Sequence, residues 1–267
     1  MLRSVLLSFS SRQRSRLVRW ITVNSIRRSG ITEMMRKEDV ASMRIDYKMP
    51  VFDESSFVAK EPFMQFDAWF KEAKTVEGIG EVNAMVLTTC GRDCRPRARI
   101  VLLKGYDKTG FTFYTNYSSM KGQQLNENPY ACLLFYWHPL HRQVRIEGRV
   151  EKLPEKESEN YFHSRPRPSQ IGALVSCNQS SPIANREVLN DKEKKLQDEY
   201  GDEEKLIPKP DYWGGFKVVP DQVEFWQGQS NRLHDRFVFR RLGEDEVIDD
   251  SLTKKGTDGW VYERLSP

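Results

Sequence analysis

The chain has 267 residues, of which 38% are hydrophobic and 30% charged, a composition typical of one large or two small globular domains. No run approaches the roughly 18 apolar residues that a membrane-spanning helix needs, so we expect no membrane partner. The formal net charge of +4 is concentrated at one end, because residues 1–32 hold seven arginines and no Asp, Glu or Lys. The rest holds 35 basic and 38 acidic residues, which argues against a nucleic-acid partner, since binding to phosphate backbones needs clustered Lys and Arg.

The first 32 residues are typical of a targeting leader. They are rich in Arg and Ser, the first acidic residue is Glu33, and apolar positions 2, 5, 6 and 9 recur at helical spacing. An amphipathic, Arg-rich and acid-poor segment is the pattern of a mitochondrial transit peptide, and the apolar run is too short for a secretory signal. A basic tail without an address is the alternative. We therefore predict a mitochondrial or a cytoplasmic protein, in which residues 33–60 form a polar N-terminal arm.

Residues 61–267 are predicted to form a single α+β domain. A helix is expected near 62–74, because aromatic residues share one face and Pro62 suits the first turn. Short apolar segments follow at 83–89, 97–104, 111–115, 130–137 and 143–153, with a turn at 106–110 and a short helix at 119–126. Helices at 154–163 and 183–200 come next, then strands at 215–219, 222–226, 234–240 and 260–265. Short strands with tight turns favour an antiparallel sheet that closes on itself.

The common motifs of phosphate loops and hydrolases are absent from the sequence. There is no GxGxxG, GxxxxGK[ST], GxSxG or HExxH. The four histidines are scattered and the four cysteines lack CxxC spacing, so we expect no metal site and free thiols.

Arginine instead occupies unusual places. Arg97 and Arg99 lie two apart on an expected strand and so share a face, which suits an anion because guanidinium groups bond phosphate in a bidentate way. Arg232, His234 and Arg236 alternate in another extended segment, where they would repel one another unless an anion or carboxylates neutralise them. A solvated barrel exterior with salt bridges, or an exposed edge strand, would explain these two spacings as well.

A third cluster combines a phenol, a guanidinium and a hydroxyl. Tyr161 and Arg165 are helical neighbours at i and i+4, and Ser169 follows after Pro166 and Pro168, which must end the helix. Such a group at a helix end suits a phosphate clamp. An ordinary helix cap with a surface arginine remains the alternative.

Taken together, these segments resemble the pyridoxine/pyridoxamine 5′-phosphate oxidase family. The resemblance extends from about Met43 to Pro267. It is carried by RARIVLLKG (97–105), FYTNY…KG (113–122), FYW…RQVRIEG (135–148), YFHSRPRPSQIGA (161–173), NQSS (178–181), WGG (213–215), EFWQGQSNRLHDR (224–236) and the ending YERLSP.

The resemblance implies an antiparallel split β-barrel with flanking helices, working as a homodimer with FMN at the interface. By matching position, the FMN-binding residues would be Arg99, Ile100, Val101, Leu102, Tyr114, Thr115, Lys121, Gln143, Gln179, Ser180, Trp226 and Arg236. The substrate-binding residues would be Lys104, Tyr161, Arg165, Ser169, Arg232 and His234, of which the last two would be catalytic and lie over the pyridine ring.

The implied reaction belongs to vitamin B6 metabolism. Pyridoxine 5′-phosphate or pyridoxamine 5′-phosphate would be oxidised to pyridoxal 5′-phosphate with FMN and O2, giving H2O2, and ammonia from the amine. Two rival classes are a split-barrel flavin reductase, which would lack the substrate-binding residues, and a non-enzymatic pyridoxal-phosphate carrier that has lost its flavin. The sequence departs from the family at Met120, where an Arg usually precedes Lys121, and by one extra residue near Cys177–Asn178.

Overall fold

The computed structural model describes residue 40 and residues 42–43, 45–202, 204–244 and 246–267. The predicted leader, residues 1–32, lies outside these residues. Contacts divide the chain into Met1–Asp46 and Tyr47–Pro267, and all features discussed below lie in the second unit. Among the described residues, no helix is both long and apolar enough to cross a membrane.

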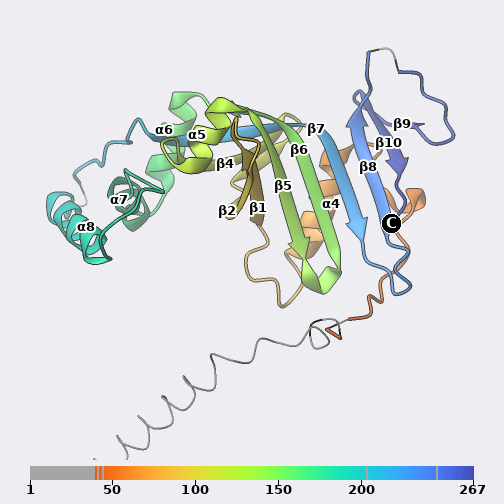
Figure 1. Cartoon of the computed structure of the whole chain (residues 1–267), viewed down its shortest axis with the longest axis horizontal. Coiled ribbons are helices and arrows are strands. Elements are labelled where there is room, and N and C mark those ends of the chain that lie inside the picture. Colours follow the sequence, from red (N-terminus) through yellow and green to blue (C-terminus); the bar gives the residue numbers. More distant parts are fainter. Residues whose placement is uncertain (1–39, 41, 44, 203, 245) are drawn as a thin grey trace, which may run out of the picture. The chain divides into compact units, whose positions relative to one another are not determined.

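The second unit is built on one antiparallel sheet of ten strands (Figure 1). The strand order is β2-β1-β5-β6-β7-β8-β10-β9, and β4 joins through β7 and carries β3 at its other edge. The strands are β1 (Ala84–Cys90), β2 (Pro96–Leu102), β3 (Gly105–Asp107), β4 (Gly110–Asn116), β5 (Tyr130–Trp137), β6 (Arg142–Lys152), β7 (Trp213–Gln227), β8 (Asp235–Arg241), β9 (Lys254–Lys255) and β10 (Trp260–Arg264). The prediction of an α+β chain with an antiparallel sheet is confirmed.

Strand β7 connects the two ends of this sheet. One of its edges pairs with β6, while the other pairs with β4 over its first half and with β8 over its second half. The register against β6 shifts at Glu147/Gly148, so Asp221 has no partner in β6. A bulge of this kind bends a strand and increases its twist, which allows one strand to serve two parts of the sheet.

The sequence predicted two strands where β7 is continuous. Pro220 cannot donate to a ladder and, with Asp221, reads as a break between 215–219 and 222–226. A bulge tolerates a proline, so the strand continues through it.

Helices cover the sheet and extend it at the β4 end. They are η2 (Glu54–Ser56), α4 (Pro62–Ala73), α5 (Met120–Glu127), η3 (His138–Leu140), α6 (Glu155–Ser164), α7 (Arg167–Val175) and α8 (Glu187–Glu199). The predicted helix near 62–74 is confirmed as α4, which the Glu61 side chain caps by accepting bonds from two backbone N–H groups. Its Phe66 and Trp69 are buried in the main core. Helices α6–α8 lie at the opposite side of this unit from β8–β10 (Figure 1).

Helix α7 and strand β3 were missing from the prediction. Helix α6 does end before Pro166, as expected, but a new helix begins at Arg167 with Pro168 in its first turn. Proline is tolerated there because the first N–H groups of a helix have no partner within it. The expected turn at 106–110 includes the end of β3, which forms a tight hairpin with β4.

The predicted arm does not stay polar throughout. The compact unit begins at Tyr47, and Phe52 is only 3% exposed. The ring of Phe57 lies 4.8 Å from that of Phe237, centroid to centroid. Two aromatic residues without a periodic pattern carry no local signal of burial, so the arm's place against the core depends on tertiary contacts.

Candidate functional site

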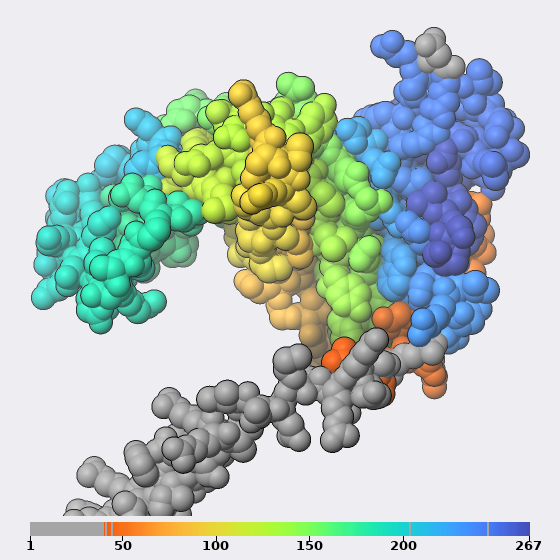
Figure 2. Space-filling model, in the orientation of Figure 1, coloured from red at the N-terminus to blue at the C-terminus, as the bar shows by residue number. Residues whose placement is uncertain are grey.

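A pocket of about 490 Å³ lies between β2, β4, α5 and α7. The surface is hollowed between the teal residues of α7 and α8 and the yellow residues around β2 (Figure 2). The pocket gathers eleven of the predicted site residues, Arg99, Ile100, Val101, Leu102, Lys104, Tyr114, Thr115, Lys121, Arg165, Ser169 and Gln179. The structure therefore brings together residues that are separated in the sequence by up to four secondary-structure elements.

Two half-buried cations form one side of the pocket. Arg99 donates from Nη1 to the Leu87 carbonyl at 3.0 Å and to Thr89 Oγ1 at 2.7 Å. Lys121 donates from Nζ to Thr115 Oγ1 and to Gln179 Oε1, both at 3.2 Å. These partners are neutral and fix both cations without cancelling their charge.

The electrostatics of these two cations favour an anion. Burial, followed by the positive charge of Arg97, lowers the pKa of Arg99. Burial, followed by the charge of Arg99, lowers the pKa of Lys121. Within the described part of the chain, the residues that line the pocket include no Asp or Glu. A bound anion such as a phosphate would stabilise both charged groups.

Arg97 has a different role from Arg99, although the two share a strand. Its guanidinium lies 3.0 Å from Asp93 in an exposed ion pair. The salt-bridge alternative is therefore correct for Arg97, whereas Arg99 faces the pocket.

The third predicted cluster forms the other side of the pocket. Arg165 stacks its guanidinium on Trp213, with its central carbon 4.8 Å from the ring centroid. Its Nη1 is buried and has no hydrogen-bond partner among the residues that the structure describes. Leaving a buried donor unpaired costs about 1–3 kcal/mol, so an oxygen of a ligand would be stabilising here.

Tyr161 contributes indirectly. It does not line the pocket but stacks on Tyr114, with ring centroids 3.9 Å apart. Tyr114 in turn stacks on Trp213 at 5.5 Å, so three parallel rings support the wall on which Arg165 lies.

Two helices begin at this pocket. Ser119 caps α5 by accepting the Gly122 N–H, and Lys121 stands in the first turn. Ser169 stands in the first turn of α7. The free N–H groups and the dipole at a helix N-terminus favour anions, which adds to the attraction of the cationic side chains.

Met120 supplies no third cation. Its side chain is 44% exposed, and its backbone N–H donates to Ser180 Oγ at 3.3 Å. Ser180 adopts a left-handed conformation, with φ of 78°, next to the pocket residue Gln179. The departure from the family pattern therefore leaves Arg99 and Lys121 as the cations on this side.

Five predicted site residues lie elsewhere, around β6–β8. Gln143 stands opposite Trp226 in the β6–β7 register, and Trp226 stands opposite Arg236 in the β7–β8 register. Arg236 donates to the buried Glu224 at 2.7 Å. The His234 ring lies 4.8 Å from that of Trp226, and Arg232 is exposed. None of these five lines the pocket of Arg99 and Arg165 within the described chain.

The predicted extended segment from Arg232 to Arg236 is wrong in its first half. β8 begins at Asp235, and Arg232 lies in a turn with φ of 65°. The Arg232 N–H donates to the Gln229 carbonyl, which closes the turn. Strand alternation therefore does not explain how Arg232, His234 and Arg236 are arranged, since only Arg236 belongs to a strand.

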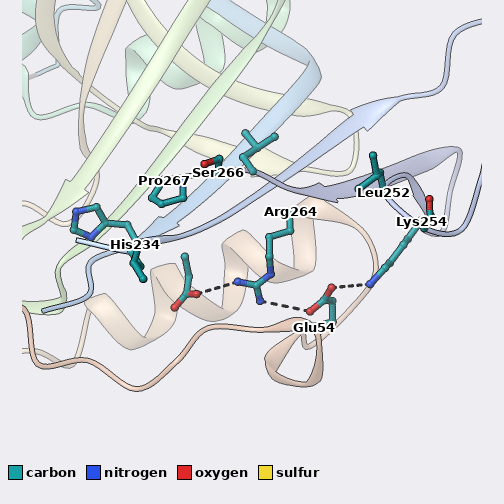
Figure 3. Close-up of a pocket in the computed structure, with 11 residues that line it drawn as sticks. Glu54, His234, Leu252, Lys254, Arg264, Ser266 and Pro267 are labelled. Atoms are coloured by element: carbon teal, nitrogen blue, oxygen red, sulfur yellow. Dashed lines mark hydrogen bonds and ion pairs between the residues drawn. The ribbon is translucent and has the colours of Figure 1, made fainter. Parts of the chain in front are cut away.

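His234 lies at the edge of a second pocket, of about 570 Å³ (Figure 3). Arg264 stands in this pocket between Glu54 and Asp235, and Glu54 also pairs with Lys254 at 2.8 Å. The C-terminal residues Ser266 and Pro267 line it as well.

Several pocket residues were missed from the sequence. Asn116, Gly172, Ala173, Ser176 and Trp213 line the first pocket. Three of them lie on or beside α7, which was not predicted. Trp213 was noted for the glycines beside it but could equally have been a core residue. In the described residues, no cluster of His, Cys, Asp and Glu could hold a metal ion.

The fold and the pocket define a split-barrel protein that binds phosphate-bearing ligands in a cationic cleft. A family model described as pyridoxamine 5′-phosphate oxidase matches residues 72–198, and one described as the pyridoxine 5′-phosphate oxidase C-terminal dimerisation region matches residues 213–267. The chain belongs to the pyridoxamine 5′-phosphate oxidase family.

Similar proteins carry the same description. Pyridoxine-5′-phosphate oxidase from Bos taurus is 54% identical over 233 residues, which is 86% of this chain and 88% of the relative. Pyridoxine/pyridoxamine 5′-phosphate oxidase from Bombyx mori is 53% identical over 231 residues, 86% of this chain and 90% of the relative.

Solved structures agree on the fold. PhzG from Burkholderia lata 383, in complex with tetrahydrophenazine-1-carboxylic acid, superposes with a TM-score of 0.70 at 27% identity, over 82% of this chain and 98% of that one. A pyridoxamine 5′-phosphate oxidase-related, FMN binding protein from Nostoc punctiforme gives 0.55 at 14% identity, over 78% and 98%. This second likeness supports the fold alone.

Proposed function

We propose that this chain is a homodimeric, FMN-dependent oxidase that converts pyridoxine 5′-phosphate and pyridoxamine 5′-phosphate to pyridoxal 5′-phosphate. Relatives that share more than half of their residues with it bear the names of this oxidase, and its C-terminal region matches a dimerisation region. The observation that carries the proposal is the cationic pocket, in which two separate groups of donors can each take a phosphate.

The residues of this pocket fit FMN. Arg99 and Lys121 are half-buried cations without acidic partners in the described pocket lining, and the first turn of α5 adds backbone donors. We assign the FMN phosphate to this side of the pocket. When bound, FMN supplies a flavin ring that accepts a hydride equivalent from the substrate and is reoxidised by O2.

The second group of donors suits the phosphate of the substrate. Arg165 offers its unpartnered Nη1, Ser169 offers the first turn of α7, and Lys104 offers an exposed ammonium. Tyr161 holds Tyr114 and, through it, the wall of the pocket. Fixing the substrate by its phosphate orients the carbon to be oxidised, which is the main contribution of the protein to such a reaction.

The remaining predicted residues complete the site from a second chain. Gln143, Trp226 and Arg236 lie in a row on three adjacent strands, beside Arg232 and His234. This second set lies outside the first pocket in one chain, and we infer that a homodimer joins the set of one protomer to the pocket of its partner. Arg232 and His234 would then face the pyridine ring.

The proposal is tested by incubating the purified protein with FMN and pyridoxine 5′-phosphate. We expect formation of the aldehyde, release of peroxide, and a yellow protein with flavin absorption. A protein that binds pyridoxal 5′-phosphate without taking up flavin would instead be a carrier. A yellow protein that reduces free flavin but leaves pyridoxine 5′-phosphate unchanged would be a flavin reductase.

A further inference from the structure

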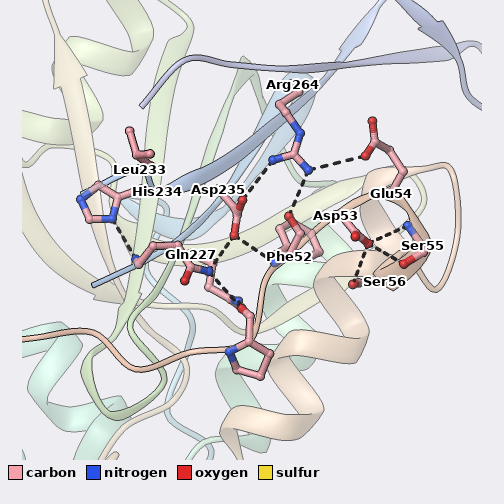
Figure 4. Close-up of polar contacts among 12 residues, drawn as sticks. Phe52, Asp53, Glu54, Ser55, Ser56, Gln227, Leu233, His234, Asp235 and Arg264 are labelled. Carbon is pink, nitrogen blue, oxygen red and sulfur yellow. Dashed lines mark hydrogen bonds and ion pairs between the residues drawn. The ribbon is translucent and has the colours of Figure 1, made fainter. Parts of the chain in front are cut away.

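Asp235 stands between two predicted ligand-binding residues, His234 and Arg236, yet it is only 6% exposed and points into the protein. Its Oδ2 accepts the Phe52 N–H at 2.9 Å and Gln229 Nε2 at 2.7 Å, and its Oδ1 accepts Arg264 Nη1 at 3.0 Å (Figure 4). One carboxylate therefore ties together the chain before α4, the turn that precedes β8, and β10.

Arg264 neutralises this buried carboxylate. Its guanidinium also lies 3.5 Å from Glu54 and 4.3 Å from the centroid of the Phe237 ring. A buried charge is tolerated only when it is paired and hydrogen-bonded, and Asp235 has both kinds of partner. The carboxylate is therefore held in one orientation.

Gln229 links this carboxylate to His234. Its side chain donates to Asp235 and to the Pro50 carbonyl, the latter at 3.0 Å. Its backbone N–H donates to His234 Nδ1 at 3.0 Å (Figure 4). A nitrogen that accepts a hydrogen bond carries a lone pair, so a neutral His234 ring must carry its proton on Nε2.

The surroundings of His234 keep its ring neutral. Burial, followed by the positive charge of Arg232, lowers the pKa of His234, while Asp235 opposes the shift. The Tyr47 and Trp226 rings, at 5.9 Å and 4.8 Å between centroids, leave little room for the imidazole to turn over.

We propose that Gln229 and Asp235 are positioning residues that hold His234 as its Nε2–H tautomer, so that His234 donates a hydrogen bond to the ring oxygen of the substrate and does not act as a base. The inference rests on the proposed function and deepens it, because it assigns the proton at a stated atom. In this arrangement His234 stabilises negative charge on the phenolic oxygen of the substrate. Arg264 supports the arrangement by pairing with Asp235.

Nitrogen NMR of the FMN-loaded protein, labelled in its histidines, tests the tautomer directly. With four histidines in the chain, the His234 signals can be assigned by their loss in His234→Gln. We expect a protonated Nε2 and an unprotonated, hydrogen-bonded Nδ1. A proton on Nδ1 of the unchanged protein would overturn the proposal, and this readout is independent of whether pyridoxine 5′-phosphate is the substrate.

Gln229→Ala tests the positioning role. It removes both side-chain anchors of the turn, and we expect kcat to fall about 10- to 100-fold, as for a small misplacement of a reacting group. KM and FMN content should change less than about twofold, since binding groups lie elsewhere, and the NMR signals should show mixed tautomers. Unchanged kcat together with an unchanged tautomer would refute the role.

Gln227→Ala is the matched control. Gln227 also donates to the Pro50 carbonyl and is buried, but it contacts neither His234 nor Asp235 through any hydrogen bond found in the described residues. We expect this variant to melt at a lower temperature while keeping the Nε2–H tautomer. A loss of the tautomer in Gln227→Ala equal to that in Gln229→Ala would reduce the effect to general loosening and contradict the proposal.

The charge on Arg264 offers a second comparison. Arg264→Lys keeps a cation opposite Asp235, whereas Arg264→Met removes it. We expect the lysine variant to recover most of the kcat that the methionine variant loses. Equal kcat values in the two variants would show that the pairing of Asp235 does not act through His234. An unchanged protein that fails to oxidise pyridoxine 5′-phosphate at all would instead contradict the proposed function and leave the tautomer measurement standing.

Discussion

The guanidinium carbon of Arg165 lies 4.8 Å from the centroid of the Trp213 ring, and the Nη1 of the same side chain is buried with no partner in the described residues. The ring holds the cation in place while leaving one donor free. A site prepared in this way binds an anion with little rearrangement, because the guanidinium is already oriented.

Arg165→Met should therefore weaken substrate binding. A hydrogen bond to a charged group contributes about 1.5–3 kcal/mol, so we expect KM for pyridoxine 5′-phosphate to rise about 10- to 100-fold. FMN content should remain near that of the unchanged protein, because Arg99 and Lys121 are retained. Arg97→Met is the control, since Arg97 pairs with Asp93 at the surface and should leave KM unchanged.

Arg232→Ala should lower turnover far more than it lowers FMN content. Arg232 is exposed in a turn beside His234 and is expected to face the substrate ring, whereas the predicted flavin ligands lie on other residues. Steady-state kinetics and the flavin-to-protein absorbance ratio measure the two quantities. Near-normal turnover on pyridoxine 5′-phosphate would show that Arg232 does not act on the ring.

Met120→Arg should tighten FMN binding. The side chain is exposed at the start of α5, next to Lys121, and an arginine there would add a cation where the family usually has one. One charge-assisted bond of about 1.5–3 kcal/mol would lower Kd for FMN by about 10- to 100-fold, which quenching of flavin fluorescence can follow. Met64→Arg, at an exposed position on α4, should leave Kd unchanged.

Glu224 should protect the fold against acid. Burial raises its pKa, but hydrogen bonds and charges from Arg236 and Arg145 outweigh this, and the pKa of Glu224 is lowered from 4.5. Because the folded-state pKa lies below the unfolded value, the carboxylate stabilises the fold above pH 4.5, and this contribution disappears as the pH falls through the folded-state pKa.

Glu224→Gln should accordingly lower Tm at pH 7 and lose less stability than the unchanged protein on acidification. Thermal denaturation between pH 7 and pH 3 measures both effects. Parallel curves for the two proteins would show that the Glu224 carboxylate carries no pH-dependent stability.

The address of the chain rests on residues 1–32, whose seven arginines are not balanced by any acid. Fused to a reporter, these residues should direct it to mitochondria, because a transit peptide is read as a basic amphipathic helix. The same segment with its arginines replaced by glutamine should leave the reporter diffuse. A diffuse signal from the unchanged segment would favour the cytoplasmic alternative.

Much of the architecture follows from local patterns in the chain. The aromatic face of 62–74 predicted α4, and short apolar runs predicted most strands, because side-chain periodicity and turn residues act over a few positions. The spaced motifs from 97 to 236 were specific enough to indicate the family. These features needed no knowledge of how distant segments pack.

Other features depend on contacts between segments that are far apart in sequence. Local reasoning divided β7 at Pro220, because the bulge that tolerates this proline is visible only against β6. It grouped Arg97 with Arg99, although Asp93 pairs with one and the pocket takes the other.

The sequence by itself determined that this chain folds as an antiparallel α+β protein with residues for FMN and a phosphorylated substrate. Tertiary structure decided how those residues are held. The Phe52 N–H that bonds Asp235 lies 183 positions away, and Gln229 reaches His234 only because a turn brings its backbone back. Hydrogen bonds require atoms within about 3 Å, and that closeness is a property of the folded chain, which no local pattern encodes.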